Sequence, residues 1–195
     1  MWPLLLLSII SITVTLERVA FLISLSINSN SSSLDSMLEA VELGNIEYSI
    51  SIGRESKNFV CRALTYALTH RRNSFTSALL RAAAMELNRF NRGLSILDTT
   101  ITLAPLLGLL GTVTGMIHAF GLLGTQELNA PVAITGGIAE ALIATAFGLG
   151  VAIVSLLPFN ILNSKAEQAR HAIEDAATRL EILLHPNASI EASEP

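Results

Sequence analysis

Two long segments with almost no charged residues constrain the fold of this chain more than any other feature. One runs from about residue 99 to 123 and contains no Asp, Glu, Lys or Arg, and the other runs from 130 to 159 with Glu140 as its single such residue. A helix needs about 20 apolar residues to cross a bilayer, so both segments are long enough. Only the short link GTQELNAP joins them. The pattern predicts an antiparallel pair of membrane-spanning helices.

A third apolar run lies near the amino terminus, from Trp2 to Leu16, followed by Glu17, Arg18 and the segment VAFLISLSI. In a secretory signal peptide the positive charge precedes the apolar core, whereas here Arg18 follows it. We therefore expect a retained transmembrane helix, with the Arg18 side chain reaching the headgroups at the membrane edge.

Composition supports a membrane protein and excludes several other classes. Hydrophobic residues make up 51% of the chain and charged residues only 14%, whereas a soluble domain carries about 25% charged residues. No basic block of the kind that binds nucleic acid is present, so nucleic acid is not an expected partner. The single cysteine, Cys61, excludes an internal disulfide and a multi-cysteine metal site. Because the sequence has no metal-ligand spacing, no nucleophile with a base and no phosphate-binding glycine loop, we expect neither an enzyme nor a cofactor.

The distribution of basic residues predicts the orientation. All 12 Lys and Arg residues lie in the segments 18 to 92 and 165 to 179, and the link between the two long runs has none. Under the positive-inside rule those two segments are cytoplasmic. The amino terminus and the short link then face outward, and the carboxyl terminus faces the cytoplasm.

Small residues follow one face of both long segments at helical spacing. Leucine-rich positions from Leu80 to Ile101 precede the first segment and lead into its Ala104 and three glycines. The second segment has its own small residues at matching intervals. In lipid, small residues allow helix backbones to approach closely, so this face predicts helix contacts within and between subunits. We expect a kink at Pro105. The predicted packing residues are Gly108, Gly111, Gly115, Gly148 and Ala152.

The resulting fold class is an all-α membrane protein with three transmembrane helices, of which the second and third are long and extend into the cytoplasm. The small-residue face also predicts packing between subunits, in a ring. We expect transmembrane helix 1 over 1–27, a cytoplasmic linker with short helices over 28–73, a long helix with transmembrane helix 2 over 74–123, a periplasmic loop over 124–130, transmembrane helix 3 with its extension over 131–184, and a flexible tail over 185–195.

Glu140 is the residue most indicative of function. Holding a charged side chain at mid-bilayer costs about 2.5 to 3.5 kcal/mol on insertion scales, so Glu140 should face protein or water. Thr112 lies at a similar depth on the neighbouring span, and Thr145 lies about 140° around the helix from Glu140. A proton path through these three residues and a permanently protonated, hydrogen-bonded Glu140 remain alternatives. His118 is more typical of an interfacial or packing residue, and its role stays open.

The segments RGLSILDTTITLAPLLGLLGTVTGMIHAF (92–120) and GGIAEALIATAFGLGVAIVSLLPFN (136–160) resemble the MotA/TolQ/ExbB proton channel family, most closely its ExbB members. The resemblance implies a pentamer of three-span subunits around the spans of a small ExbD-like or TolR-like partner that supplies the proton-carrying aspartate. It further implies proton flow that moves a TonB-like envelope protein. The family's intramembrane glutamate falls on Glu140, and its pore threonines fall on Thr112 and Thr145. ExbB also has an extended outer amino-terminal segment, whose contacts we do not expect here.

The expected function is therefore that of a proton-driven, ExbB-like motor subunit that energises transport across the outer membrane together with its partner. Two alternatives stay open. One is a TolQ-like subunit of the Tol-Pal envelope system, and the other is a membrane scaffold that conducts no ions. Dissipating the proton gradient separates the motor from the scaffold, because a scaffold does not depend on the gradient.

Overall fold

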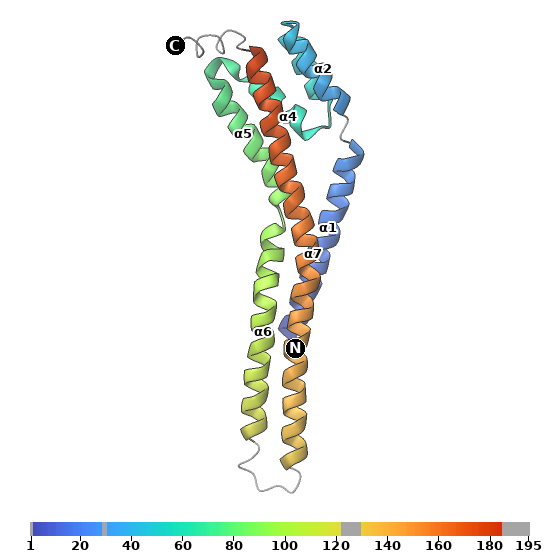
Figure 1. Cartoon of the computed structure of the whole chain (residues 1–195), viewed down its shortest axis with the longest axis vertical. Helices are drawn as coiled ribbons and strands as arrows, with labels where there is room; N and C mark the ends of the chain where they lie inside the picture. The colour runs from blue at the N-terminus through green and yellow to red at the C-terminus, as the bar shows by residue number, and fades with distance from the viewer. Residues whose placement is uncertain (1, 29–30, 122–129, 185–195) are drawn as a thin grey trace, which may run out of the picture. The chain divides into compact units, whose positions relative to one another are not determined.

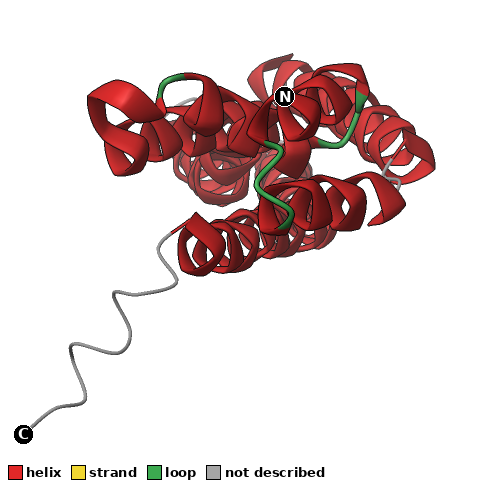
Figure 2. Cartoon of the chain, turned by 90° about the horizontal axis from the view of Figure 1, so that it is seen from above, coloured by secondary structure: helices red, strands yellow, loops and turns green. Residues whose placement is uncertain are grey.

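The computed structural model describes residues 2–28, 31–121 and 130–184, and in these ranges the only regular secondary structure is α-helix (Figure 2). Three helical segments are long and apolar enough to cross a membrane: Trp2–Leu25, Leu94–Gly121 and a span within Ile134–Leu184. This confirms the all-α class and the three apolar spans. The helices are α1 (Trp2–Asn28), α2 (Ser31–Glu42), α3 (Ile46–Glu55), α4 (Phe59–Thr69), α5 (Arg71–Asn91), α6 (Leu94–Gly121) and α7 (Ala130–Leu184).

The chain forms two compact units. The first comprises Met1–Val19 with Gly93–Asn163, and the second comprises Ala20–Arg92 with Ser164–Pro195. In the first unit α6 and the first part of α7 run side by side (Figure 1). Their contacts pair later residues of α6 with earlier residues of α7, from Ala104 on Gly148 to Ala119 on Gly137, so the two helices are antiparallel.

Helix α1 packs on the same pair through a small cluster and one polar contact. Leu4 is buried against Ala104, Val151 and Ala152. The Ser155 hydroxyl donates to the Val151 carbonyl at 2.8 Å, and the Ser11 and Ser155 hydroxyls are 2.6 Å apart, with both side chains buried. A buried hydroxyl needs such a partner, because leaving it unsatisfied costs about 1 to 3 kcal/mol. The serine pair therefore links α1 to α7 in the first unit.

The segment expected as one long helix over 74–123 is two helices in the structure. Helix α5 ends at Asn91 and α6 begins at Leu94. Gly93 has a φ of 81°, a conformation that glycine adopts without steric cost. A single glycine does not interrupt the regular spacing of the apolar residues around it. The spacing therefore did not reveal this break. Pro105, in contrast, lies inside α6 without ending it.

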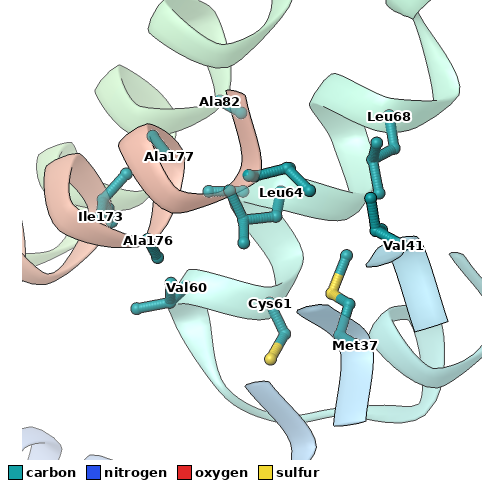
Figure 3. Packing of buried hydrophobic residues seen from close by; sticks show 12 residues of the cluster. Met37, Val41, Val60, Cys61, Leu64, Leu68, Ala82, Ile173, Ala176 and Ala177 are labelled. Atoms are coloured by element: carbon teal, nitrogen blue, oxygen red, sulfur yellow. The ribbon is translucent and has the colours of Figure 1, made fainter. Parts of the chain in front are cut away.

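The second unit has its own hydrophobic core, formed by α2, α4, α5 and the last part of α7 (Figure 3). Helix α2 begins at Ser31, within the segment 28–73 for which we expect short helices. In α5 the side chain of Leu79 packs on this core, whereas Leu80, the first of the leucine-rich positions expected on the contact face, is 66% exposed. The largest fully buried side chains of the core are Met37, Leu64, Leu68, Ile173 and Leu180.

Cys61 lies in this core and should react slowly with thiol reagents. The side chain is buried, and burial raises the pKa of its thiol, an effect that a hydrogen bond with Ser56 partly offsets. Because the thiolate is the reactive form, less of it exists at pH 8 than for an exposed cysteine. We expect almost no labelling by iodoacetamide in the folded protein and full labelling after denaturation. A Cys61→Ala, Thr76→Cys variant provides the exposed control, and equal labelling rates for the two proteins would contradict the burial of Cys61.

Candidate proton site in a groove between helices

Glycines bring the backbones of α6 and α7 into direct contact. A β-carbon built on Gly148 would stand 2.5 Å from the Ala104 carbonyl oxygen, and one built on Gly108 would stand 3.0 Å from the Thr145 α-carbon. Both glycines are buried. The distance at Gly148 leaves no room for a side chain if the helices keep their present separation, and the contact at Gly108 is tight enough that an added β-carbon would push the backbone of α7 outward.

The same contact continues along the pair toward the link. A β-carbon on Gly111 would lie 2.7 Å from the Ala144 β-carbon, and one on Gly115 would lie 2.8 Å from the Ala141 β-carbon. Ala152, at the other end of this contact, is buried with the cluster around Leu4. Because these side chains are small, a groove forms on the surface of the pair between α6 and α7.

Glu140 lines such a hollow, which we call the Glu140 groove. It has a volume of about 370 Å³, and Thr114 and His118 of α6 line it together with Glu140. Glu140 is exposed in the single chain, and among the described residues its carboxyl group has no hydrogen-bond or ion-pair partner. The remaining lining residues are all small: Gly111, Gly115, Gly137, Ala141 and Ala144.

The two threonines predicted with Glu140 lie elsewhere on the helix pair. The hydroxyl of Thr145 donates across the interface to the carbonyl of Gly108 at 3.0 Å. The hydroxyl of Thr112 donates to the carbonyl of Leu109, in its own helix, at 2.7 Å. Both side chains are half-buried, and neither lines the Glu140 groove. Within one chain, therefore, the structure does not gather Glu140, Thr112 and Thr145 around one cavity.

Sequence reasoning did not connect Thr114 and His118 with Glu140. The two residues are one helical turn apart, so they share a face of α6, and Gly111 and Gly115 lie at the same spacing. The four-residue spacing within each pair was visible in the sequence. The rotation of that face toward Glu140 was not visible, because it depends on how α6 lies against α7.

Comparison with known proteins points to one family. The model of the MotA/TolQ/ExbB proton channel family matches residues 53–175. Over 195 aligned residues the chain is 37% identical to the biopolymer transport protein ExbB-like 1 of Synechocystis sp., a match that covers 94% of this chain and 74% of that protein. It is 42% identical over 80 residues to the biopolymer transport protein ExbB of Neisseria gonorrhoeae, covering 41% of this chain and 36% of that protein.

A third relative matches most of this chain. The biopolymer transport protein ExbB homologue of Methanothermobacter thermautotrophicus is 31% identical over 163 residues, which cover 82% of this chain and 57% of the relative. Several of the relatives thus extend well beyond the part that this chain matches. The family match spans more than half of the chain and includes α6 and the part of α7 that carries Glu140. The chain is a multi-pass membrane protein that belongs to the MotA/TolQ/ExbB proton channel family.

Proposed function

We propose that this chain is an ExbB-like subunit of an inner-membrane motor driven by the proton gradient, which energises TonB-dependent transport across the outer membrane. The observation that carries the proposal is the position of Glu140, a carboxyl group without a hydrogen-bond or ion-pair partner among the described residues, on a groove within an apolar helix pair. Intramembrane carboxyl groups are expensive to hold and are usually functional. Membership of a proton channel family supports a role for the Glu140 carboxyl group in proton transfer.

Glu140 is exposed in the single chain, which supports assembly with other subunits. A charged group facing lipid at mid-bilayer would cost about 2.5 to 3.5 kcal/mol, so the Glu140 groove should face a neighbouring protein or water in the membrane. A homopentamer with the spans of an ExbD-like or TolR-like partner inside it provides that surface. The small residues that line the groove allow the neighbour to approach the Glu140 carboxyl closely.

The partner also completes the proton path. Between Glu127 and Lys165 of this chain, Glu140 is the only residue among Asp, Glu, Lys, Arg and His. A relay across the bilayer needs more than one titratable group or a chain of hydrated hydroxyls. We assign the second acidic group to the partner and assign the pore hydroxyls to Thr112 and Thr145. The distribution of Lys and Arg supports a cytoplasmic position for the segments 18 to 92 and 165 to 179 and a periplasmic amino terminus.

Complementation tests the proposal. The chain is expressed, with and without an ExbD-like single-span protein, in bacteria that lack their own ExbB and ExbD and also their own TolQ and TolR. TonB-dependent uptake of an iron chelate should appear only when both proteins are present and should stop when a protonophore is added. Uptake that survives the protonophore would support the scaffold instead. Restored detergent resistance without restored uptake would assign the chain to the TolQ-like alternative.

A further inference from the structure

A surface in the second unit combines an apolar and a basic hollow. The apolar hollow has a volume of about 470 Å³, and most of its lining is apolar, including Leu22 and Ile23 of α1 and Phe59 of α4. Lys165 and Gln168 of α7 line it as well. Ile23 is 55% exposed. Leu25 and Phe90 line this hollow and also line the basic one, so the two are adjoining parts of one surface.

The basic hollow carries an excess of positive charge. It has a volume of about 190 Å³, and its charged lining residues are Lys57, Arg62, Glu86 and Arg89. The Arg62 guanidinium donates two hydrogen bonds to the Glu86 carboxylate, at 3.0 and 2.6 Å, and Arg89 lies 3.4 Å from the same group. The lining of the basic hollow thus holds three cationic side chains and one carboxylate, that of Glu86. Lys57 is exposed and has no ion-pair partner in the part of the chain that the structure describes.

The position of the two hollows at the end of a membrane span indicates that a membrane lipid occupies them. Leu25 is the last residue of the apolar span Trp2–Leu25, and Leu22 and Ile23 belong to its final turn. The surface therefore lies where α1 leaves the hydrocarbon core, beside the headgroup layer. An anionic phospholipid has a phosphate that matches the basic hollow and acyl chains that match the apolar one. A soluble phosphate would leave the apolar hollow unoccupied.

We propose that this surface binds one anionic phospholipid. Lys57 and Arg89 contact its phosphate, and the Glu86 carboxylate holds the Arg62 and Arg89 guanidinium groups in place. The first part of an acyl chain lies on Ile23 and its apolar neighbours. The site would fasten the end of α1 to α4 and α5 at the membrane edge.

Native mass spectrometry of the full chain in detergent, with added phosphatidylglycerol or phosphatidylcholine, tests the proposal. We expect the chain to prefer phosphatidylglycerol and the Lys57→Gln/Arg89→Gln variant to lose about thirtyfold in affinity for it, since each basic residue near an anionic lipid contributes about fivefold. The control Arg54→Gln/Arg81→Gln removes the same charge from exposed residues that line neither hollow, and it should bind like the unchanged chain. If the test variant loses its helical circular dichroism spectrum, Lys57→Gln alone, which breaks no described ion pair, should still lower affinity about fivefold.

Three results would overturn the proposal. Equal losses in the test and control pairs would mean that the lipid follows net charge rather than this surface. Equal affinity for phosphatidylcholine would remove the role of the basic hollow. Binding of soluble glycerol 1-phosphate as tightly as phosphatidylglycerol would remove the role of the apolar hollow, and would leave a simple phosphate site.

Discussion

Replacing Glu140 with alanine should reduce energised uptake at least about tenfold, equivalent to about 1.4 kcal/mol in the rate-limiting step, while subunits still assemble. The carboxyl group lies on the groove rather than in the contact between α6 and α7, so its loss leaves the helix pair intact. Glu140→Gln should fail in the same way, because the amide keeps the shape but cannot exchange a proton. The measurement is the initial rate of uptake in the complementation strain.

The matched control is Leu142→Ala, which changes an exposed neighbour on α7 that does not line the groove. This variant should keep near-normal uptake. Chemical crosslinking reports assembly for each variant, so a failure to assemble is distinguishable from a failure to conduct. Thr112→Ala, tested in parallel, should also abolish uptake if its hydroxyl lines the path. Full uptake by Glu140→Ala would refute the role assigned to this residue, and full uptake by Thr112→Ala would remove the threonine from the path.

Gly148→Ala should destabilise the chain by about 3 kcal/mol, the upper end of the usual cost of overpacking. The added β-carbon would stand 2.5 Å from the Ala104 carbonyl oxygen. That atom belongs to a helix backbone and cannot rotate away as a side chain would, so α6 and α7 must separate along the whole contact. A lower thermal unfolding midpoint in detergent and less folded protein in membranes are the expected results.

Gly150→Ala makes the same chemical change two residues later, where a β-carbon would meet nothing within 4 Å. It should leave the midpoint unchanged or raise it slightly, because alanine is the better helix former by about 1 kcal/mol. A second pair repeats the comparison nearer the link: a β-carbon on Gly137 would lie 2.9 Å from the Ala119 β-carbon, whereas one on Gly136 would meet nothing within 4 Å. If Gly148→Ala and Gly150→Ala behave alike, the close contact is not what holds the pair together.

The amino-acid sequence by itself determined the three apolar spans and the isolation of Glu140. Both follow from hydropathy along the chain, because the length of an apolar run and the presence of a charge within it do not depend on what the run packs against. Glycines at helical spacing likewise indicated that helix backbones approach closely, because their spacing can be found in the sequence without knowledge of the partner helix. Residues Gly108 and Gly148 were therefore recognisable before any partner was known.

The tertiary structure alone decided which residues share a cavity with Glu140. Neighbours across two helices depend on the rotation of each helix and on their offset, and these are set by backbone contacts such as that of Gly148 with Ala104. In the offset observed, Thr114 and His118 line the groove, while Thr145 bonds to the backbone of Gly108. The break at Gly93 was likewise hidden, because hydropathy carries no information about a backbone angle that only glycine adopts freely.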